Sequence, residues 1–221
     1  MGRVKVGVLI SGRGSNLQAL IKACRAPDYP AEIVLVLSNV AGAGGLALAK
    51  KAGIPTAVIP HKDFAARAAF DAALDTRLRE FGVEIVCLAG FLRLLGRQFT
   101  EDWPDRILNI HPSLLPAFPG LDTHRKALEA GVKISGCTVH VVRPELDDGP
   151  ILVQAALPVA DDDTPETLAA RVLKLEHRCY PLALRLLASG KVHIAGKVAH
   201  ASGTTTPRTG FLNPQEPAKR D

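Results

Sequence analysis

The stretch Val4-Lys-Val-Gly-Val-Leu-Ile-Ser-Gly-Arg-Gly-Ser-Asn16 (VKVGVLISGRGSN) joins an apolar run to a turn made of small residues. Val4–Ile10 has the continuous apolar character of a strand that is covered on both faces, and a helical pattern follows at Ser15–Ala26. A secretory signal peptide also has an apolar run behind basic residues, but this run is only about seven residues long and lacks a small-x-small cleavage site. The stretch therefore predicts the first strand, turn and helix of an α/β protein.

The same alternation continues to residue 110. Strands are predicted at Val4–Ile10, Ile33–Leu37, Thr56–Ile59, Ile85–Leu88 and Ile107–Ile110, and helices at Ser15–Ala26, Gly45–Ala52, Phe64–Phe81 and about Leu95–Glu101. Crossover connections between parallel strands are right-handed. The pattern therefore predicts an α/β fold with a Rossmann-like, doubly wound, mostly parallel sheet and helices on both faces.

The pattern changes after Gly120. His124–Ala130 is typical of a short helix, and Ser135–Val142 and Ile151–Pro158 of longer strands joined by the turn Pro144–Pro150. These strands predict a C-terminal antiparallel addition to the sheet.

A long final helix is predicted next. Thr164 or Asp163 can cap it, Pro165 stands in its first turn, and its pattern runs to about Ala188. The segment 200–221 is polar and rich in Pro and Thr without periodicity, which predicts a mobile tail.

Composition narrows the class of protein. Of the 221 residues 47% are apolar, and no apolar run approaches the roughly 18–20 residues that cross a bilayer, so we expect no membrane partner. The four cysteines, Cys24, Cys87, Cys137 and Cys179, are scattered, which argues against a zinc or redox site and favours reduced thiols in a cytoplasmic protein. A net charge of +5 fits anionic small molecules as well as nucleic acid.

The glycine-rich turn Ser11–Asn16 is the first candidate site. Backbone N–H groups at a helix N-terminus bind anions, and small residues let the anion approach. A dinucleotide fingerprint is incomplete, because Leu17 replaces the third glycine and Ser38 and Asn39 stand where an acidic residue would hold the ribose. A site for a single phosphate is favoured, with a plain βα turn capped by Ser15 as the alternative.

Asn109 and His111 form the second candidate site, within ILNIHPSLLPAFPG (residues 107–120). Alternate residues of a strand share a face, and the carboxyl end of a parallel strand is where open α/β sheets bind ligands. An amide that can donate to an oxyanion and an imidazole that can carry a proton suit acyl transfer. A buried pair that only caps neighbouring loops is the alternative.

Other segments gain meaning by their place in the fold. Asp147 lies in a turn, and a carboxylate near a histidine favours the imidazolium, although an exposed turn is the plain interpretation. Leu88–Leu95 (LAGFLRLL) is a pocket wall or core. His124 and His140 are candidates to line the same region, whereas Glu176-His177 is typical of a solvated pair on a helix.

Together, SGRGSN, LAGFLRLL, NIHPSLLPAFPGLDTH, LDDGP and LEHRCYPLAL resemble the glycinamide ribonucleotide formyltransferases, folate-dependent enzymes of purine biosynthesis, from about Val4 to Ala195. The resemblance implies formyl transfer from 10-formyltetrahydrofolate, a co-substrate, to the amine of glycinamide ribonucleotide, without a metal. It implies one formyltransferase domain over 1–195, with a Rossmann-like nucleotide-binding half (1–110) and a catalytic and folate-binding half (111–195). Asp122 departs from the family pattern, in which His is common.

The resemblance also implies roles for individual residues. Asn109, His111 and Asp147 would be catalytic. The ribonucleotide would be held by Gly14, Ser15, Asn16, Leu173, Lys174, Leu175 and Glu176. The folate would be held by Arg67, Leu92, Arg93, Leu94, Leu95, Asn109, Arg143, Pro144, Glu145, Leu146 and Asp147. We expect small-molecule substrates, no nucleic acid, and a monomer or homodimer.

Three alternatives remain. Methionyl-tRNA formyltransferase would need a further folded C-terminal domain, and formyltetrahydrofolate deformylase a regulatory domain before the first strand; the sequence predicts neither. The third alternative is a nucleotide-binding Rossmann protein without formyl transfer, which the incomplete fingerprint disfavours.

Overall fold

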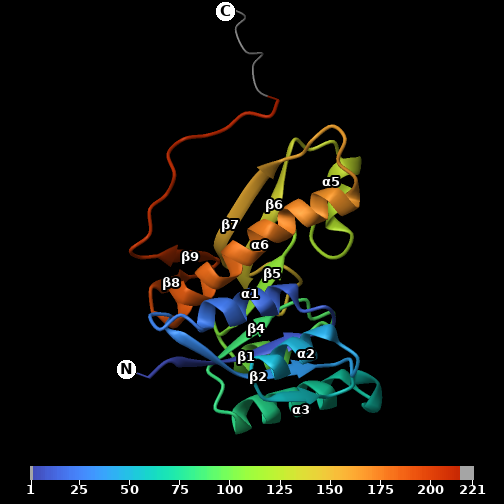
Figure 1. Ribbon diagram of the computed structural model, residues 1–221, viewed down its shortest axis with the longest axis vertical. Helices are drawn as coiled ribbons and strands as arrows, with labels where there is room; N and C mark the ends of the chain where they lie inside the picture. The colour runs from blue at the N-terminus through green and yellow to red at the C-terminus, as the bar shows by residue number, and fades with distance from the viewer. Residues whose placement is uncertain (1, 215–221) are drawn as a thin grey trace, which may run out of the picture.

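The computed structural model describes residues 2–214, which form one nine-stranded sheet with helices on both faces (Figure 1). The strand order is β3-β2-β1-β4-β5-β6-β7-β9-β8. Strands β3, β2, β1, β4 and β5 are parallel, β6 runs antiparallel to β5, and β7 runs antiparallel to β6. The predicted doubly wound sheet with an antiparallel addition is confirmed.

The parallel strands are β1 (Val4–Ile10), β2 (Ala31–Ser38), β3 (Thr56–Val58), β4 (Ile85–Leu88) and β5 (Ile107–His111). Every residue of β4 and the last five of β1 are buried, which explains their continuous apolar sequences. The chain order reverses between the neighbours β1 and β4, and the carboxyl ends of β1, β4 and β5 border this switch point, which is where the ligand-binding crevice of an open α/β sheet lies.

The helices that cover the sheet are α1 (Ser15–Cys24), α2 (Gly44–Lys51) and α6 (Pro165–Ala188) on one face, and α3 (Arg67–Glu80) and α4 (Arg97–Asp102) on the other. Strand β1 contributes to both layers because its side chains alternate. Val8 and Ile10 pack under α1 and α6, whereas Leu9 packs with α3. Two hydrophobic cores therefore pack against opposite faces of the central strands.

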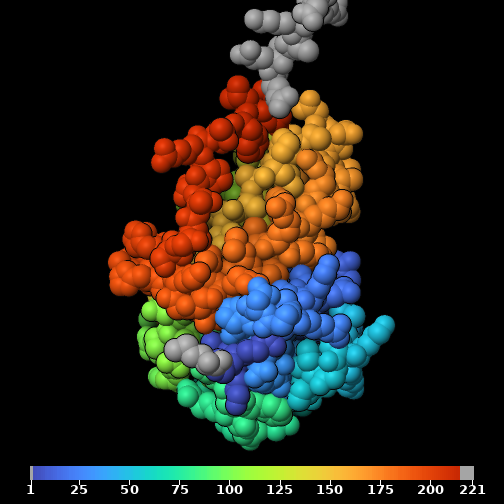
Figure 2. Space-filling view, turned by 60° about the vertical axis from the view of Figure 1, so that its left-hand side comes forward, coloured from blue at the N-terminus to red at the C-terminus, as the bar shows by residue number. Residues whose placement is uncertain are grey.

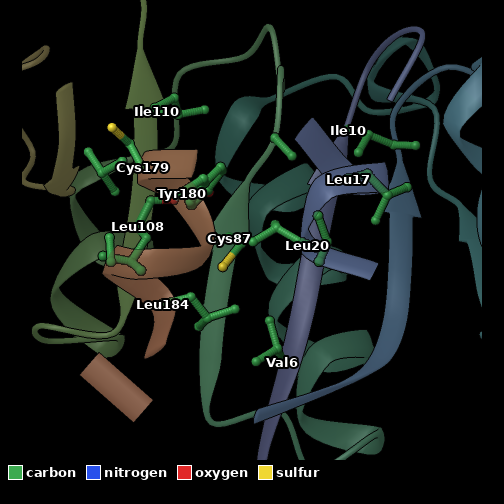
Figure 3. Packing of buried hydrophobic residues seen from close by; sticks show 14 of the residues in the cluster. Val6, Ile10, Leu17, Leu20, Cys87, Leu108, Ile110, Cys179, Tyr180 and Leu184 are labelled. Atoms are coloured by element: carbon green, nitrogen blue, oxygen red, sulfur yellow. Dashed lines mark hydrogen bonds between the residues drawn. The ribbon is translucent and has the colours of Figure 1, made fainter. Parts of the chain in front are cut away.

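Tyr180 on α6 is the largest fully buried side chain and lies between β4 and β5 (Figure 3). Its hydroxyl lies 3.1 Å from the Leu88 carbonyl oxygen and 3.0 Å from the Leu108 carbonyl oxygen, and its proton is shared between them. Because Leu88 ends β4 and Leu108 precedes Asn109, the helix is tied to both strands just where they reach the crevice.

The antiparallel part consists of β6 (Ile134–Val141) and β7 (Ile151–Pro158), preceded by α5 (Thr123–Glu129) and followed by β8 (Val192–Ala195) and β9 (Val198–Ala201). The β5–β6 register sets Asn109 opposite His140 and His111 opposite Thr138. Thr164 caps α6, since its hydroxyl accepts a hydrogen bond from the Thr167 N–H at 3.3 Å.

One predicted helix is shorter than expected. In place of a helix over Phe64–Phe81, a 3₁₀ turn (η1, His61–Asp63) precedes α3, which begins at Arg67. Phe64 has an extended backbone, and its ring meets Phe70 edge-on with 5.8 Å between centroids. The aromatic contact is made by the chain entering the helix, which an apolar pattern alone cannot distinguish from another helical turn.

The tail prediction is wrong at its start. His200 and Ala201 belong to β9, where His200 pairs with His193, so backbone hydrogen bonding overrides the polar composition there. Beyond β9 the chain runs past β7 (Figures 1 and 2), and the Asn213 amide donates to the Lys133 and Val159 carbonyls at 2.6 and 2.9 Å. Residues 215–221 of the predicted tail lie outside the described residues.

In the described part of the chain, no helix combines the length and apolarity that a membrane span requires.

Candidate active site

His111 ends β5 and is held by the loop that follows it. Its residue surface is 5% exposed, and Nε2 lies 2.9 Å from the Phe118 carbonyl oxygen. Because a carbonyl only accepts, this contact places a proton on Nε2. Phe118 has a positive φ of 53°, so the loop folds back toward the strand that it leaves.

The loop that holds His111 is itself hydrogen-bonded to the antiparallel strands. Thr138 donates to the Ser113 carbonyl at 2.7 Å and accepts from the Leu115 N–H at 3.0 Å. Gln154 on β7 donates to the Leu115 carbonyl at 2.9 Å. The prolines of ILNIHPSLLPAFPG therefore stiffen a loop whose polar backbone groups are satisfied by β6 and β7.

Asp147 lies against His111, a proximity that sequence spacing does not reveal. The closest approach is 3.4 Å between Asp147 Oδ2 and His111 Nδ1, and both side chains are 7% exposed. The Gly120 N–H also donates to Oδ2, at 2.9 Å. His111 therefore presents both ring nitrogens to acceptors, an arrangement that an imidazolium satisfies on both sides and a neutral imidazole on one.

His140 completes the cluster from the facing strand. The Asn109 amide nitrogen lies 3.2 Å from His140 Nε2, and His140 Nδ1 lies 3.1 Å from the Val141 carbonyl oxygen. Burial lowers the pKa of His140, and this outweighs the nearby Asp147 carboxylate, 3.7 Å away. A neutral ring with its proton on Nδ1 satisfies both contacts, and Nε2 then accepts from Asn109.

His140 was predicted only as a lining residue. Its role follows from the register, because it lies directly opposite Asn109 in the β5–β6 ladder. His124 lies nearby, half-buried, and burial lowers its pKa as well. Antiparallel pairing of two polar residues is the signal that would have found His140.

The glycine-rich turn lies beside this cluster, at the N-terminus of α1. Gly14 has a positive φ of 81°, and a Cβ there would stand 2.6 Å from the Gly45 Cα, so only glycine lets α1 and α2 approach so closely. Ser11 donates to Asn39 Oδ1 at 2.6 Å and accepts from the Leu92 N–H at 2.8 Å. The predicted phosphate turn and the predicted folate segment are thus in direct contact.

Glu176 is buried, not solvated. It is 7% exposed, and its Oε2 accepts a hydrogen bond from Asn16 Nδ2 at 2.7 Å. Burial raises the Glu176 pKa, whereas the Asn16 hydrogen bond acts to lower it. Asn16 Oδ1 is buried and has no partner among the described residues. The neighbours of Glu176 on α6 differ from it in exposure, because successive helical residues point about 100° apart. Lys174 is exposed and Leu175 packs against the core.

The side chains of residues 92–95 also differ in exposure. Leu92 and Leu94 are 71% and 58% exposed, whereas Leu95 packs in the core. Arg67 and Arg93 are exposed nearby. Buried Asp71 accepts a hydrogen bond from the Gly96 N–H at 2.7 Å, which ties this segment to α3. Apolar side chains exposed to this degree are available to a ligand.

Ion pairs hold the turn that carries Asp147. Glu145 pairs with Arg97 at 3.1 Å and Asp148 with Lys197 at 2.6 Å, while Arg143 pairs with Asp105. Asp147 itself has a positive φ of 53°. Asp148 therefore points to the β8–β9 hairpin and Asp147 to His111. Pro144 is half-buried and Leu146 is exposed.

Among residues 2–214, no three His, Cys, Asp or Glu side chains are grouped as metal ligands would be.

Known proteins resemble this chain over most of its length. The family described as formyl transferase matches residues 4–184. The trifunctional purine biosynthetic protein adenosine-3 of Gallus gallus is 55% identical over 198 residues, which are 89% of this chain and 20% of that protein. This chain thus spans about a fifth of the length of such relatives.

Shorter relatives match end to end. The phosphoribosylglycinamide formyltransferase of Haemophilus influenzae is 41% identical over 209 residues, covering 95% of this chain and 99% of that protein. The crystal structure of glycinamide ribonucleotide transformylase 1 from Symbiobacterium toebii superimposes with a TM-score of 0.88 at 49% identity, covering 90% and 94% of the two chains.

Proposed function

Because the chain belongs to the formyl transferase family, we propose that it transfers the formyl group of 10-formyltetrahydrofolate to the amine of glycinamide ribonucleotide. The Haemophilus influenzae relative, matched over 99% of its length, has the name of this activity. The observation that carries the proposal is the contact between His111, Asp147, Asn109 and His140 at the carboxyl end of β5.

Formyl transfer needs two kinds of assistance. The amine nitrogen attacks the formyl carbon, a C–N bond forms, and the carbonyl electron pair moves onto oxygen. Collapse of the tetrahedral intermediate breaks the bond to N10 of the folate, so N10 gains a proton and the attacking amine loses one. The site must therefore stabilise an oxyanion and move a proton.

Asn109 is suited to the oxyanion. Its amide has two N–H groups, and one is directed at His140 Nε2, which leaves the other for the substrate. The neutral tautomer of His140 thereby fixes the orientation of Asn109. A donor that is already held in place loses no orientational freedom in the reaction step.

His111 is suited to carry the proton and to place positive charge beside the oxyanion. Asp147 stabilises that charge at 3.4 Å, and Phe118 orients the ring through its carbonyl. Asp147 would also hold a water that relays the proton between the two nitrogens.

The two substrates would occupy opposite ends of the crevice. The N–H groups at Gly14, Ser15 and Asn16 would bind the phosphate of the ribonucleotide, and Glu176 a ribose or glycinamide group. Leu92 and Leu94 would contact the pterin ring of the folate, with the turn 143–147 over it. Arg67 and Arg93 would face the carboxylates of the folate's glutamate tail. Leu173 shares the helix face of Glu176, three residues away.

The test supplies 10-formyl-dideazafolate with and without glycinamide ribonucleotide, and follows both loss of the formyl group and formation of formylglycinamide ribonucleotide. We expect transfer only when both substrates are present. Formate release without the ribonucleotide would identify a deformylase. Binding of NAD without any transfer would identify a nucleotide-binding protein of another class.

A His111→Ala variant tests the assignment of the site. We expect turnover to fall by about 10²–10⁴-fold, the usual contribution of general acid–base catalysis, while the ribonucleotide affinity measured by calorimetry stays within about twofold of wild type.

A further inference from the structure

A groove outside the crevice runs along the outer surface of α1, between α6 and α2. Figure 1 shows α1 between these two helices, and Figure 2 shows the orange surface of α6 against the blue N-terminal segment. The groove has a volume of about 1030 Å³. Its floor is low because Ser15, Ala19 and Ala23, spaced four residues apart, all have small side chains.

The groove is cationic. Lys22, Lys51 and Arg178 are exposed on its sides, and within residues 2–214 none of the three makes an ion pair. Its lining contains no acidic residue. Arg25 lies at its far end, where it also lines an adjoining hollow together with the acidic Glu32. Lys22, Lys51 and Arg178 therefore dominate the local field.

One end of the groove is the predicted phosphate site. Ser15 lines the groove and also begins the anion-binding N-terminus of α1. The two helices run side by side from this end: Asn16 at the start of α1 contacts Glu176, and Tyr29, in the segment after α1, donates to the Pro181 carbonyl of α6 at 2.7 Å. The groove thus leads along α1 to Ser15, which precedes Asn16 of the buried Asn16–Glu176 pair.

We propose that this groove attracts the phosphate of the ribonucleotide substrate electrostatically and guides it to the N-terminus of α1. The inference rests on the proposed function, since it concerns the substrate of the same site. It assigns a role to Lys22, Lys51 and Arg178, which take no part in the formyl-transfer step. Charges along such a path raise association rates by about 10–10³-fold at low salt.

Distance decides how salt should act. Seven residues separate Ser15 from Lys22, which is about 10 Å along the helix axis. The Debye length is about 8 Å at 0.15 M salt and about 30 Å at 0.01 M. Attraction by Lys22 is therefore weak at physiological ionic strength and strong in dilute buffer, so the experiment compares the two conditions.

The experiment measures kcat/KM for the ribonucleotide at saturating 10-formyl-dideazafolate, for the full chain, a Lys51→Glu variant and a Lys22→Glu/Lys51→Glu double variant. For the double variant we expect about a tenfold loss at 0.01 M ionic strength that shrinks to about twofold at 0.15 M, with kcat unchanged. Lys51→Glu alone should show a smaller loss with the same dependence on salt. Arg178→Glu should act in the same direction. With glycinamide ribonucleoside, which lacks the phosphate, the variants should equal wild type.

Lys50→Glu is the matched control. Lys50 is exposed, precedes Lys51 in the last turn of α2, and does not line the groove. It changes the net charge by the same amount as Lys51→Glu, and we expect kcat/KM within about twofold of wild type at both salt concentrations. Circular dichroism melting of each variant checks that the fold is retained.

The outcomes separate the two proposals. Equal effects of Lys50→Glu and Lys51→Glu, or equal losses with the ribonucleotide and the ribonucleoside, would overturn the groove as a guide while formyl transfer stands. Absence of transfer by the wild-type chain would overturn the proposed function and, with it, this inference.

Discussion

Oδ2 of Asp147 lies 3.4 Å from Nδ1 of His111, and the same oxygen accepts a hydrogen bond from the Gly120 N–H. The carboxylate is therefore held between the turn that carries it and the loop that follows β5. This one side chain therefore links the turn 143–147 both to His111 and to the loop that holds it.

Asp147→Asn keeps the shape of this contact and removes its charge. We expect kcat to fall by about 10²-fold or more, because the carboxylate that lies 3.4 Å from His111 Nδ1 is replaced by a neutral amide. Steady-state kinetics with both substrates measure this loss.

Asp148→Asn is the control for that experiment, since Asp148 pairs with Lys197 on the surface and not with His111. Exposed ion pairs contribute little, so kcat should stay within about twofold of wild type. A larger loss in Asp148→Asn than in Asp147→Asn would reverse the assignment of the two carboxylates.

Asn109 and His140 should behave as a unit. We expect Asn109→Ala to lower kcat by about 10²–10³-fold, as loss of an oxyanion donor does, and His140→Ala to lower it about tenfold by releasing the orientation of Asn109. In the double variant the His140→Ala change should then have no further effect. Strictly additive losses in this double-mutant cycle would show that His140 acts independently of Asn109.

The pattern of residues predicted the parts of this site that follow from backbone periodicity. Asn109 and His111 share a face because side chains alternate along a strand, and the apolar runs of β1 and β4 placed them in a parallel sheet. The distinction between Asp147 and Asp148 was not predictable in the same way. It depends on a positive φ at Asp147 and on Lys197 in a hairpin that the sequence left in an unassigned segment.

Glu176 shows a signal that was present but not used. Leu168, Val172, Glu176, Cys179 and Ala183 recur at helical spacing and are all buried, so Glu176 lies on the apolar face of α6. Two adjacent polar residues such as Glu176-His177 are typical of the solvated face of a helix. The spacing of the apolar residues instead places Glu176 among buried side chains. Its partner Asn16 is distant in sequence, and only the packing of α1 on α6 reveals it.

Tyr180→Phe tests the link between α6 and the end of β5. The hydroxyl donates to the Leu88 and Leu108 carbonyl oxygens. Its loss should therefore lower the free energy of unfolding, measured in urea, by about 1–2 kcal/mol. We also expect a several-fold lower kcat, because Asn109 follows Leu108 directly.

Tyr29→Phe provides the comparison. Its hydroxyl donates to the Pro181 carbonyl on the same helix, at 2.7 Å, away from the crevice. We expect a similar loss of stability without a change in kcat. A kcat that falls equally in both variants would mean that general loosening of α6, and not the position of β5, lowers the activity.

The buried Glu176 carboxyl makes stability depend on pH in a direction that can be checked. Burial raises its pKa above the unfolded value, so the folded state binds the proton more tightly than the unfolded state does. The cost to stability is absent below the unfolded pKa of about 4.3 and grows as pH rises from there through the raised folded pKa.

Glu176→Gln should therefore match wild type in Tm near pH 4 and exceed it at pH 7, while its KM for the ribonucleotide rises. The new amide can also donate to Asn16 Oδ1, which has no partner among the described residues. Melting curves across this pH range measure the difference, and a variant that is less stable than wild type at pH 7 would show that the charged form of Glu176 stabilises the fold.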